Sequence, residues 1–118
     1  MVIFHNFSQH FTNTKLIFFQ VESHILVSNS IDVVQCYGIT KDPETNNFMM
    51  VMEYIKNGSL RQHLNNNFNS LNWKEKLQNL FCIAYGLNKI HSKGLIHHDF
   101  HGGNILCSDY KSYITDLG

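Results

Sequence analysis

The chain lacks an excess of charge of either sign, because nine Lys and Arg residues balance nine Asp and Glu residues among its 118 residues. A balanced chain creates no long-range field that would attract nucleic acid or an anionic membrane surface. Long hydrophobic runs are missing too: residues 1–4 and 16–19 are too short for a membrane span, and no basic segment precedes an apolar signal core. The sequence therefore predicts no nucleic-acid partner, no membrane partner and a cytoplasmic location.

Cysteine is scarce, and the number of cysteines is odd. Cys36, Cys82 and Cys107 are widely spaced and embedded in apolar sequence. This usage suits reduced, packed thiols inside a cell and argues against a disulfide framework. The length fits one ordinary domain, and no repeat or interdomain linker divides it.

Residues 33–52 predict a β-hairpin. Residues 33–40 are rich in β-branched and aromatic side chains, residues 41–47 supply turn chemistry, and the apolar residues 48–52 return as the second strand. Residues 53–58 then form an extended linker. Before the hairpin, residues 16–27 are expected to form a helix.

The second half predicts two helices and several short strands. Ser59 is a candidate cap for a short helix through Leu60 and Leu64, which ends in a polar, asparagine-rich loop at residues 65–70. A long helix is expected over residues 73–91, with Gly94 ending it. Residues 95–96, 105–107 and 113–115 are strand-like. The face of the long helix expected to pack in the core carries Trp73, Leu77, Leu80, Ala84 and Leu87 at steps of four, three, four and three.

Three side chains stand in an order that phosphoryl transfer needs. Asp99 precedes Asn104 by five residues, and Asp116 follows twelve residues after Asn104. In phosphoryl transfer one aspartate orients the attacking hydroxyl and takes its proton, while an asparagine and a second aspartate hold magnesium ions. Alone, each of these residues would be typical of a turn or a cap. Together their spacing matches the pattern H-R-D-x-x-x-x-N followed by D-F-G, here with Leu117 in place of Phe.

On these residues the chain resembles a protein kinase, and residues 99–106 look most like the tyrosine-kinase-like branch. The likeness covers about residues 15–118, because hairpin, linker, long helix and both motifs arrive in the order found in kinases. It implies a truncated α+β kinase-like fold, with residues 1–52 in the small lobe, 53–58 as the hinge and 59–118 in the large lobe. It also implies ATP and magnesium as cofactors and a protein substrate whose hydroxyl group receives phosphate.

The resemblance assigns a role to each motif residue. Asp99 would orient the substrate hydroxyl, whereas Asn104 and Asp116 would bind magnesium. His97 would support the metal-binding loop, and His101 would either touch the γ-phosphate or fill the loop. The residues expected around adenine are the backbone of Glu53 and Ile55, the gatekeeper Met52 and the apolar floor Leu106.

Parts of the kinase machinery are missing from the sequence. A glycine-rich loop is absent, and the strand lysine would fall near Phe4 or His5, with Lys15 too close to serve. Gln20 stands nearest the position of the helix glutamate, whereas Glu22 would face elsewhere on the helix. Because phosphate-stabilising cations change rates by orders of magnitude, the 118-residue chain is predicted to be inactive, with the long helix exposing an apolar stripe.

Two other interpretations stay open at this point. A pseudokinase or kinase-derived binding fragment would explain the missing lysine. Zinc binding by His97, His98 and His101, helped by Asp99, would use common zinc ligands, although the spacing fits no helical H-E-x-x-H site.

Overall fold

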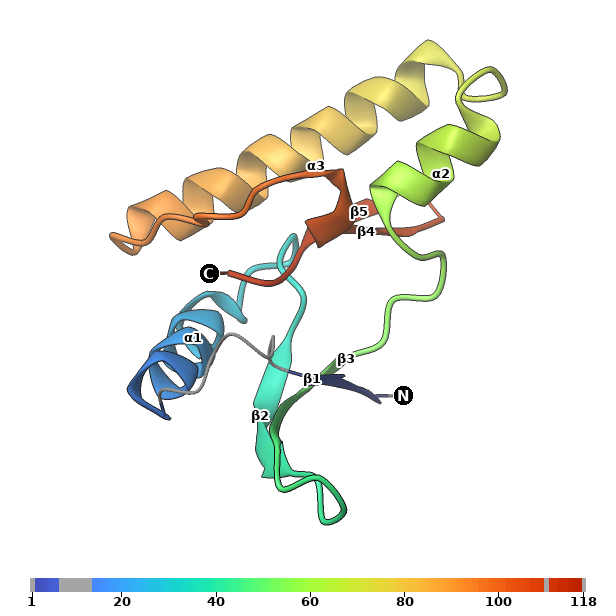
Figure 1. Ribbon diagram of the computed structural model, residues 1–118. Helices are drawn as coiled ribbons and strands as arrows, with labels where there is room; N and C mark the ends of the chain where they lie inside the picture. The colour runs from blue at the N-terminus through green and yellow to red at the C-terminus, as the bar shows by residue number, and fades with distance from the viewer. Residues whose placement is uncertain (1, 7–13, 110, 118) are drawn as a thin grey trace.

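The computed structural model describes residues 2–6, 14–109 and 111–117, so Gly118 of the D-L-G motif lies outside the described residues. Figure 1 shows a three-stranded sheet with one helix beside it, and a second group made of two helices and a small hairpin. The elements in chain order are β1 (Val2–Asn6), α1 (Thr14–Val27), β2 (Cys36–Lys41), β3 (Phe48–Glu53), α2 (Leu60–Asn67), α3 (Trp73–Ser92), the 3-10 turn η1 (Gly102–Asn104), β4 (Ile105–Ser108) and β5 (Lys111–Ile114).

The predicted hairpin forms two strands of an antiparallel sheet in the order β1-β3-β2. Asp42 closes its turn, since the carboxylate accepts hydrogen bonds from the Glu44 N–H at 2.9 Å and the Thr45 hydroxyl at 2.8 Å. Strand β2 begins at Cys36, later than predicted. A bulge between Cys36 and Gly38 shifts the register, and Gly38 has a φ of 148° that favours glycine.

Helix α1 packs against β2 and confirms the helix expected over residues 16–27. It contributes to the first hydrophobic core, which fills the space between the sheet and the helix. The buried members of this core are Val21, Val34, Cys36, Met50, Met52 and Ile55, and Ile39, Leu106 and Tyr113 pack against them.

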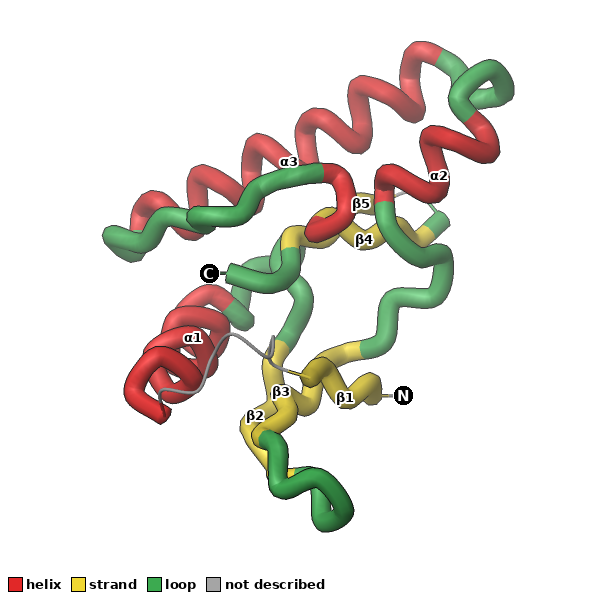
Figure 2. Tube along the Cα trace, viewed as in Figure 1, coloured by secondary structure: helices red, strands yellow, loops and turns green. Residues whose placement is uncertain are grey.

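A second core joins residues from both ends of the chain. Its buried members are Val27, Val33, Ile90, Ile114 and Leu117. The backbone connects the same segments, because the Val34 N–H donates to Ile114 O at 2.9 Å and the Ile114 N–H donates to Asp32 O at 2.9 Å. The loop before β2 is therefore fastened to β5. The course of both segments can be followed along the tube in Figure 2.

Both helices of the second group start with a capping box. The Ser59 hydroxyl accepts the Gln62 N–H at 3.2 Å, and the Asn72 side chain accepts the Glu75 N–H at 2.9 Å. The cap predicted at Ser59 is confirmed. At the other end of α3, Gly94 has a φ of 73° and its N–H donates to His91 O, as expected for a glycine that ends a helix.

The predicted inward face of α3 is wrong except at Leu87, which packs against the second core. The helix buries Cys82, Gly86 and Ile90, whereas Trp73 is 72% and Phe81 is 67% exposed. Gly86 sets this orientation, because a Cβ there would lie 2.9 Å from Ile114 Cδ1 and 3.0 Å from Asp32 O. The exposed apolar stripe predicted from the sequence is confirmed, and it carries Trp73, Leu77 and Leu80, three of the residues assigned to the core.

Three smaller predictions also need correction. Residues 95–96 belong to no strand, and β5 begins two residues before the predicted segment 113–115 and ends at Ile114. Helix α2 continues through Asn67, so only the second half of the asparagine-rich segment is a loop. The Ser59 cap and the Phe68 N–H, which donates to Leu64 O at 3.1 Å, stabilise this extra turn despite its poor helix formers. No helix among the described residues is long and apolar enough to cross a membrane.

The buried thiols give a prediction about reactivity. Cys36, Cys82 and Cys107 are free and buried, and burial raises the pKa of the Cys36 and Cys107 thiols above the ordinary value of 9.0. We expect alkylation by iodoacetamide at neutral pH to be at least about tenfold slower in the folded chain than in urea, because inert thiols are buried and protonated. Equal alkylation rates with and without urea would contradict the packing.

The raised pKa values of these two thiols also affect the pH dependence of stability. Their contribution to the free energy of unfolding is present below pH 9.0 and is lost as the pH rises above it.

Candidate active site

The loop between α3 and β4 is built around a buried histidine. His97 donates from Nε2 to Thr115 O at 2.7 Å, and its Nδ1 accepts the Asp99 N–H at 3.3 Å. Because Nδ1 accepts, the ring proton must be on Nε2. One neutral imidazole therefore binds the backbone of Asp99 and the backbone of Thr115, next to Asp116, at the same time. This is the supporting role that the resemblance implies for His97.

Asn104 connects the two chemical motifs. Its Nδ2 donates to Asp99 O at 3.0 Å and to Asp99 Oδ2 at 3.1 Å. Its backbone carbonyl accepts the Thr115 N–H at 3.0 Å. The amide nitrogen is thus occupied with Asp99, and the amide oxygen Oδ1 has no partner in the described part of the chain.

Asp116 follows directly after this junction. It has a φ of 56°, which is a left-handed conformation that aspartate adopts more readily than most residues. The Thr115 hydroxyl donates to its Oδ1 at 3.4 Å. His98 also has a positive φ, of 68°. Such backbone strain clusters at functional loops because the surrounding contacts determine the conformation.

The residues expected around adenine also come together. Met52 and Ile55 are buried in the first core, and Leu106 packs against it. The linker is fixed to β4 because the Cys107 N–H donates to Gly58 O at 2.8 Å and the Asn57 N–H donates to Cys107 O at 3.2 Å. The Glu53 N–H is taken by Gln35 O at 2.9 Å. The Ile55 N–H has no protein acceptor among the described residues.

These donor sets fit ATP and magnesium. Magnesium is usually held by one or two protein oxygen ligands together with substrate phosphates and waters, which matches one amide oxygen and one carboxylate. An apolar cluster beside a backbone N–H matches a purine. Asn104 and Asp116 are the residues that would hold the metal, and Met52, Ile55 and Leu106 would contact the base.

His101 has contacts that the sequence did not reveal. Its Nδ1 accepts the Gly103 N–H at 3.0 Å, and its Nε2 lies 3.5 Å from Asp99 Oδ2. Arg61 on α2 reaches the same ring, with Nη2 3.3 Å from Nδ1. Sequence reasoning missed Arg61, although it is the chain's only arginine and follows the Ser59 cap by two residues.

Comparison with known proteins agrees with this geometry. The sequence profile of the family described as "Protein tyrosine and serine/threonine kinase" matches residues 2–118. The chain belongs to the protein kinase family. The α+β kinase-like fold predicted from the sequence is confirmed with it.

Similar proteins from Arabidopsis thaliana narrow the branch. Leaf rust 10 disease-resistance locus receptor-like protein kinase-like 1.4 is 35% identical over 91 residues, which is 74% of this chain and 14% of that protein. A probable LRR receptor-like serine/threonine-protein kinase, MEE39, is 32% identical over 107 residues, or 85% of this chain and 12% of that protein. The chain spans 9% to 14% of the length of such relatives. Receptor-like kinases fit the tyrosine-kinase-like branch.

The kinase positions on α1 lie as the sequence predicted. Gln20 is buried, 8% exposed, and its Oε1 has no hydrogen-bond partner in the described segments. Glu22 faces solvent. On β1, His5 pairs in register with Met50, and no residue of this strand is a lysine. At the described positions of β1 and α1, the kinase fold is therefore present without the lysine and glutamate pair.

The zinc alternative finds no support. Both ring nitrogens of His97 are engaged in hydrogen bonds, so this residue cannot also bind a metal. Within residues 2–6, 14–109 and 111–117, no group of three or more His, Cys, Asp or Glu side chains is arranged to hold a metal ion.

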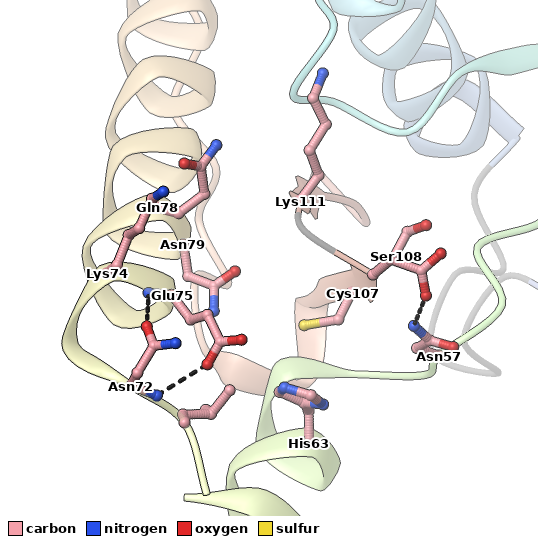
Figure 3. A pocket seen from close by; sticks show the side chains of 12 residues that line it. Asn57, His63, Asn72, Lys74, Glu75, Gln78, Asn79, Cys107, Ser108 and Lys111 are labelled. Atoms are coloured by element: carbon pink, nitrogen blue, oxygen red, sulfur yellow. Dashed lines mark hydrogen bonds between the residues drawn. The ribbon is translucent and has the colours of Figure 1, made fainter.

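A cavity of about 480 Å³ lies apart from these residues, between α2, α3 and the β4–β5 hairpin (Figure 3). None of the residues predicted for ATP, magnesium or the hydroxyl group lines it. Its two acids are already engaged, because Glu75 accepts the Asn72 N–H at 2.8 Å and Asp109 accepts from Asn57 at 3.3 Å. The Lys56 ammonium beside Asp109 and the Asn57 amide lower the pKa of that carboxyl.

Proposed function

We propose that this chain carries the nucleotide-binding and catalytic residues of a protein kinase that transfers phosphate from ATP to protein hydroxyl groups. Residues 1–52 would contribute to the small lobe, 53–58 would form the hinge and 59–118 would belong to the large lobe. The reaction would take place in the cytoplasm, where three reduced thiols are stable. The observation that carries the proposal is the pair of hydrogen bonds from Asn104 Nδ2 to Asp99.

This chain's residues divide the work among themselves. Asp99 would orient the substrate hydroxyl and accept its proton, with one carboxylate oxygen steadied by Asn104 Nδ2. Magnesium, when bound with ATP, neutralises charge on the transferred phosphoryl group. His97 keeps the two loops in register through Thr115 O. The Ile55 N–H and the carbonyl of Glu53 would hold the adenine edge.

The 118-residue chain is expected to bind ATP in the presence of magnesium and to transfer no phosphate. Binding follows from the assembled loop and apolar cluster, whereas transfer fails because Gln20 and the strand β1 supply no lysine and glutamate pair. Equilibrium dialysis with radiolabelled ATP measures binding, and incubation with a protein substrate measures transfer. Adenosine should compete for the site.

The matched variant is Asp99→Asn, which keeps the size of the side chain and removes its charge. Transfer of label by the unmodified chain that disappears in Asp99→Asn would overturn the prediction of inactivity. Failure of both ATP and adenosine to bind would overturn the proposed function itself.

A further inference from the structure

The phosphate end of ATP requires a protein cation that the usual kinase positions of this chain do not offer. In protein kinases a strand lysine, held by a helix glutamate, contacts the phosphates. Strand β1 contains no lysine, and α1 presents the buried amide of Gln20 in place of an acid. A chain that binds ATP must therefore stabilise the phosphates from another direction.

Arg61 lies against the catalytic loop from the α2 side. The first turn of α2 is fixed by the Ser59 cap, and a Cβ added at Gly102 would be 3.6 Å from the backbone nitrogen of Arg61. The helix start and η1 are thus in van der Waals range of each other. From this turn the Arg61 side chain reaches the His101 ring, with Nη2 3.3 Å from Nδ1.

The hydrogen bonds of His101 indicate that its ring is neutral, so the fixed positive charge at this place belongs to Arg61. A guanidinium group only donates, so Nδ1 must accept, and it also accepts the Gly103 N–H at 3.0 Å. The ring hydrogen is then on Nε2, which faces Asp99 Oδ2 at 3.5 Å. The Asn104 Nδ2, 3.4 Å from the same Nε2, is then a contact between two donors and no hydrogen bond, because its hydrogens go to Asp99. The imidazole is neutral in this arrangement. A Cβ at Gly103 would lie 2.7 Å from His101 Cε1, so glycine is needed there to keep the ring in place.

The guanidinium charge of Arg61 is not neutralised by the protein. Arg61 is exposed, and in the described part of the chain it forms no ion pair. Its planar donor group matches the geometry of phosphate oxygens. One imidazole ring separates it from Asp99, the residue that would meet the hydroxyl receiving the terminal phosphate.

We infer that Arg61 binds the terminal phosphate of ATP and takes over part of the role of the missing strand lysine. This inference rests on the proposed function, because it needs ATP to bind beside the catalytic loop. It assigns to α2 a contact with the nucleotide, in addition to the position of this helix after the linker.

The test compares ATP and ADP binding by the full 118-residue chain and its Arg61→Ala variant. Equilibrium dialysis with each radiolabelled nucleotide, in magnesium, gives the two dissociation constants. We expect Arg61→Ala to weaken ATP binding by about tenfold, the loss typical of one charge-assisted hydrogen bond, and to change ADP binding by less than about twofold. Arg61→Lys should keep part of the preference for ATP.

Lys74→Ala is the matched control, because it removes one exposed positive charge from the first turn of α3. It should leave both affinities unchanged, and circular dichroism should show that all variants keep their helices. Equal ATP affinity in the unmodified chain and Arg61→Ala would overturn the inference while leaving the proposed function intact. An equal loss of ATP and ADP affinity in Arg61→Ala would also overturn it. Absence of any ATP or adenosine binding by the unmodified chain would overturn both.

Discussion

Ile114→Ala is expected to lower the free energy of unfolding by about 2–5 kcal/mol, the range for truncating a fully buried aliphatic side chain. Ile114 is completely buried in the second core, and its Cδ1 occupies the space that Gly86 leaves open on α3. The cavity cannot close easily, because both backbone groups of Ile114 are fastened to residues 32 and 34. Since small domains have a total stability of about 5–15 kcal/mol, this one change removes a large share. Urea denaturation followed by circular dichroism measures it.

Ile31→Ala serves as the control for this prediction. Ile31 is 66% exposed and belongs to the same connecting loop, so its truncation should change stability by no more than about 0.5 kcal/mol. If the two variants lose equal stability, the second core does not hold the chain together as described.

Asp116→Asn is expected to remove the magnesium dependence of ATP binding. In the unmodified chain, ATP should bind at least about tenfold more tightly in magnesium than in EDTA, because a carboxylate ligand contributes a full charge to the ion. Asparagine keeps the size of the side chain and tolerates the φ of 56° at this position, so the backbone should not change. Dialysis in both buffers measures the difference.

Asp109→Asn makes the same chemical change away from the candidate site. Asp109 lies between β4 and β5 and pairs with the Lys56 ammonium at 3.1 Å on the surface, a contact of small energetic value. This variant should keep the magnesium effect in full. Loss of the effect in Asp109→Asn, or its survival in Asp116→Asn, would show that Asp116 does not bind the metal.

Local signals predicted much of the fold. The hairpin, α1 and the Ser59 cap depend on residues close in sequence, and the structure confirms all three. The spacing of Asp99, Asn104 and Asp116 also indicated a shared site. In the structure Asn104 forms hydrogen bonds with Asp99 and with Thr115, the residue before Asp116. The local elements are predictable because their partners lie close in the sequence, whereas the link between the two motifs was implied by the resemblance to kinases.

The features that the sequence did not predict depend on contacts between residues far apart in the chain. Helix α3 is apolar on two sides, and periodicity cannot say which side meets β5. Gly86 determines which side faces β5, because its lack of a side chain lets the helix approach Ile114 in that strand. Ile114 is 28 positions away in the sequence, and a hydrophobicity pattern does not reveal this contact. Arg61 was missed for a similar reason, because its contact with His101 spans 40 residues.

The second core also constrains the order of events during synthesis. Val27 and Val33 leave the ribosome long before Ile114 and Leu117, yet all four are buried in one cluster. A nascent chain that has not yet reached β5 exposes the apolar side chains of Val27 and Val33, and such chains are prone to aggregate or to bind chaperones. The packing of this core is therefore completed only after Leu117 has been synthesised.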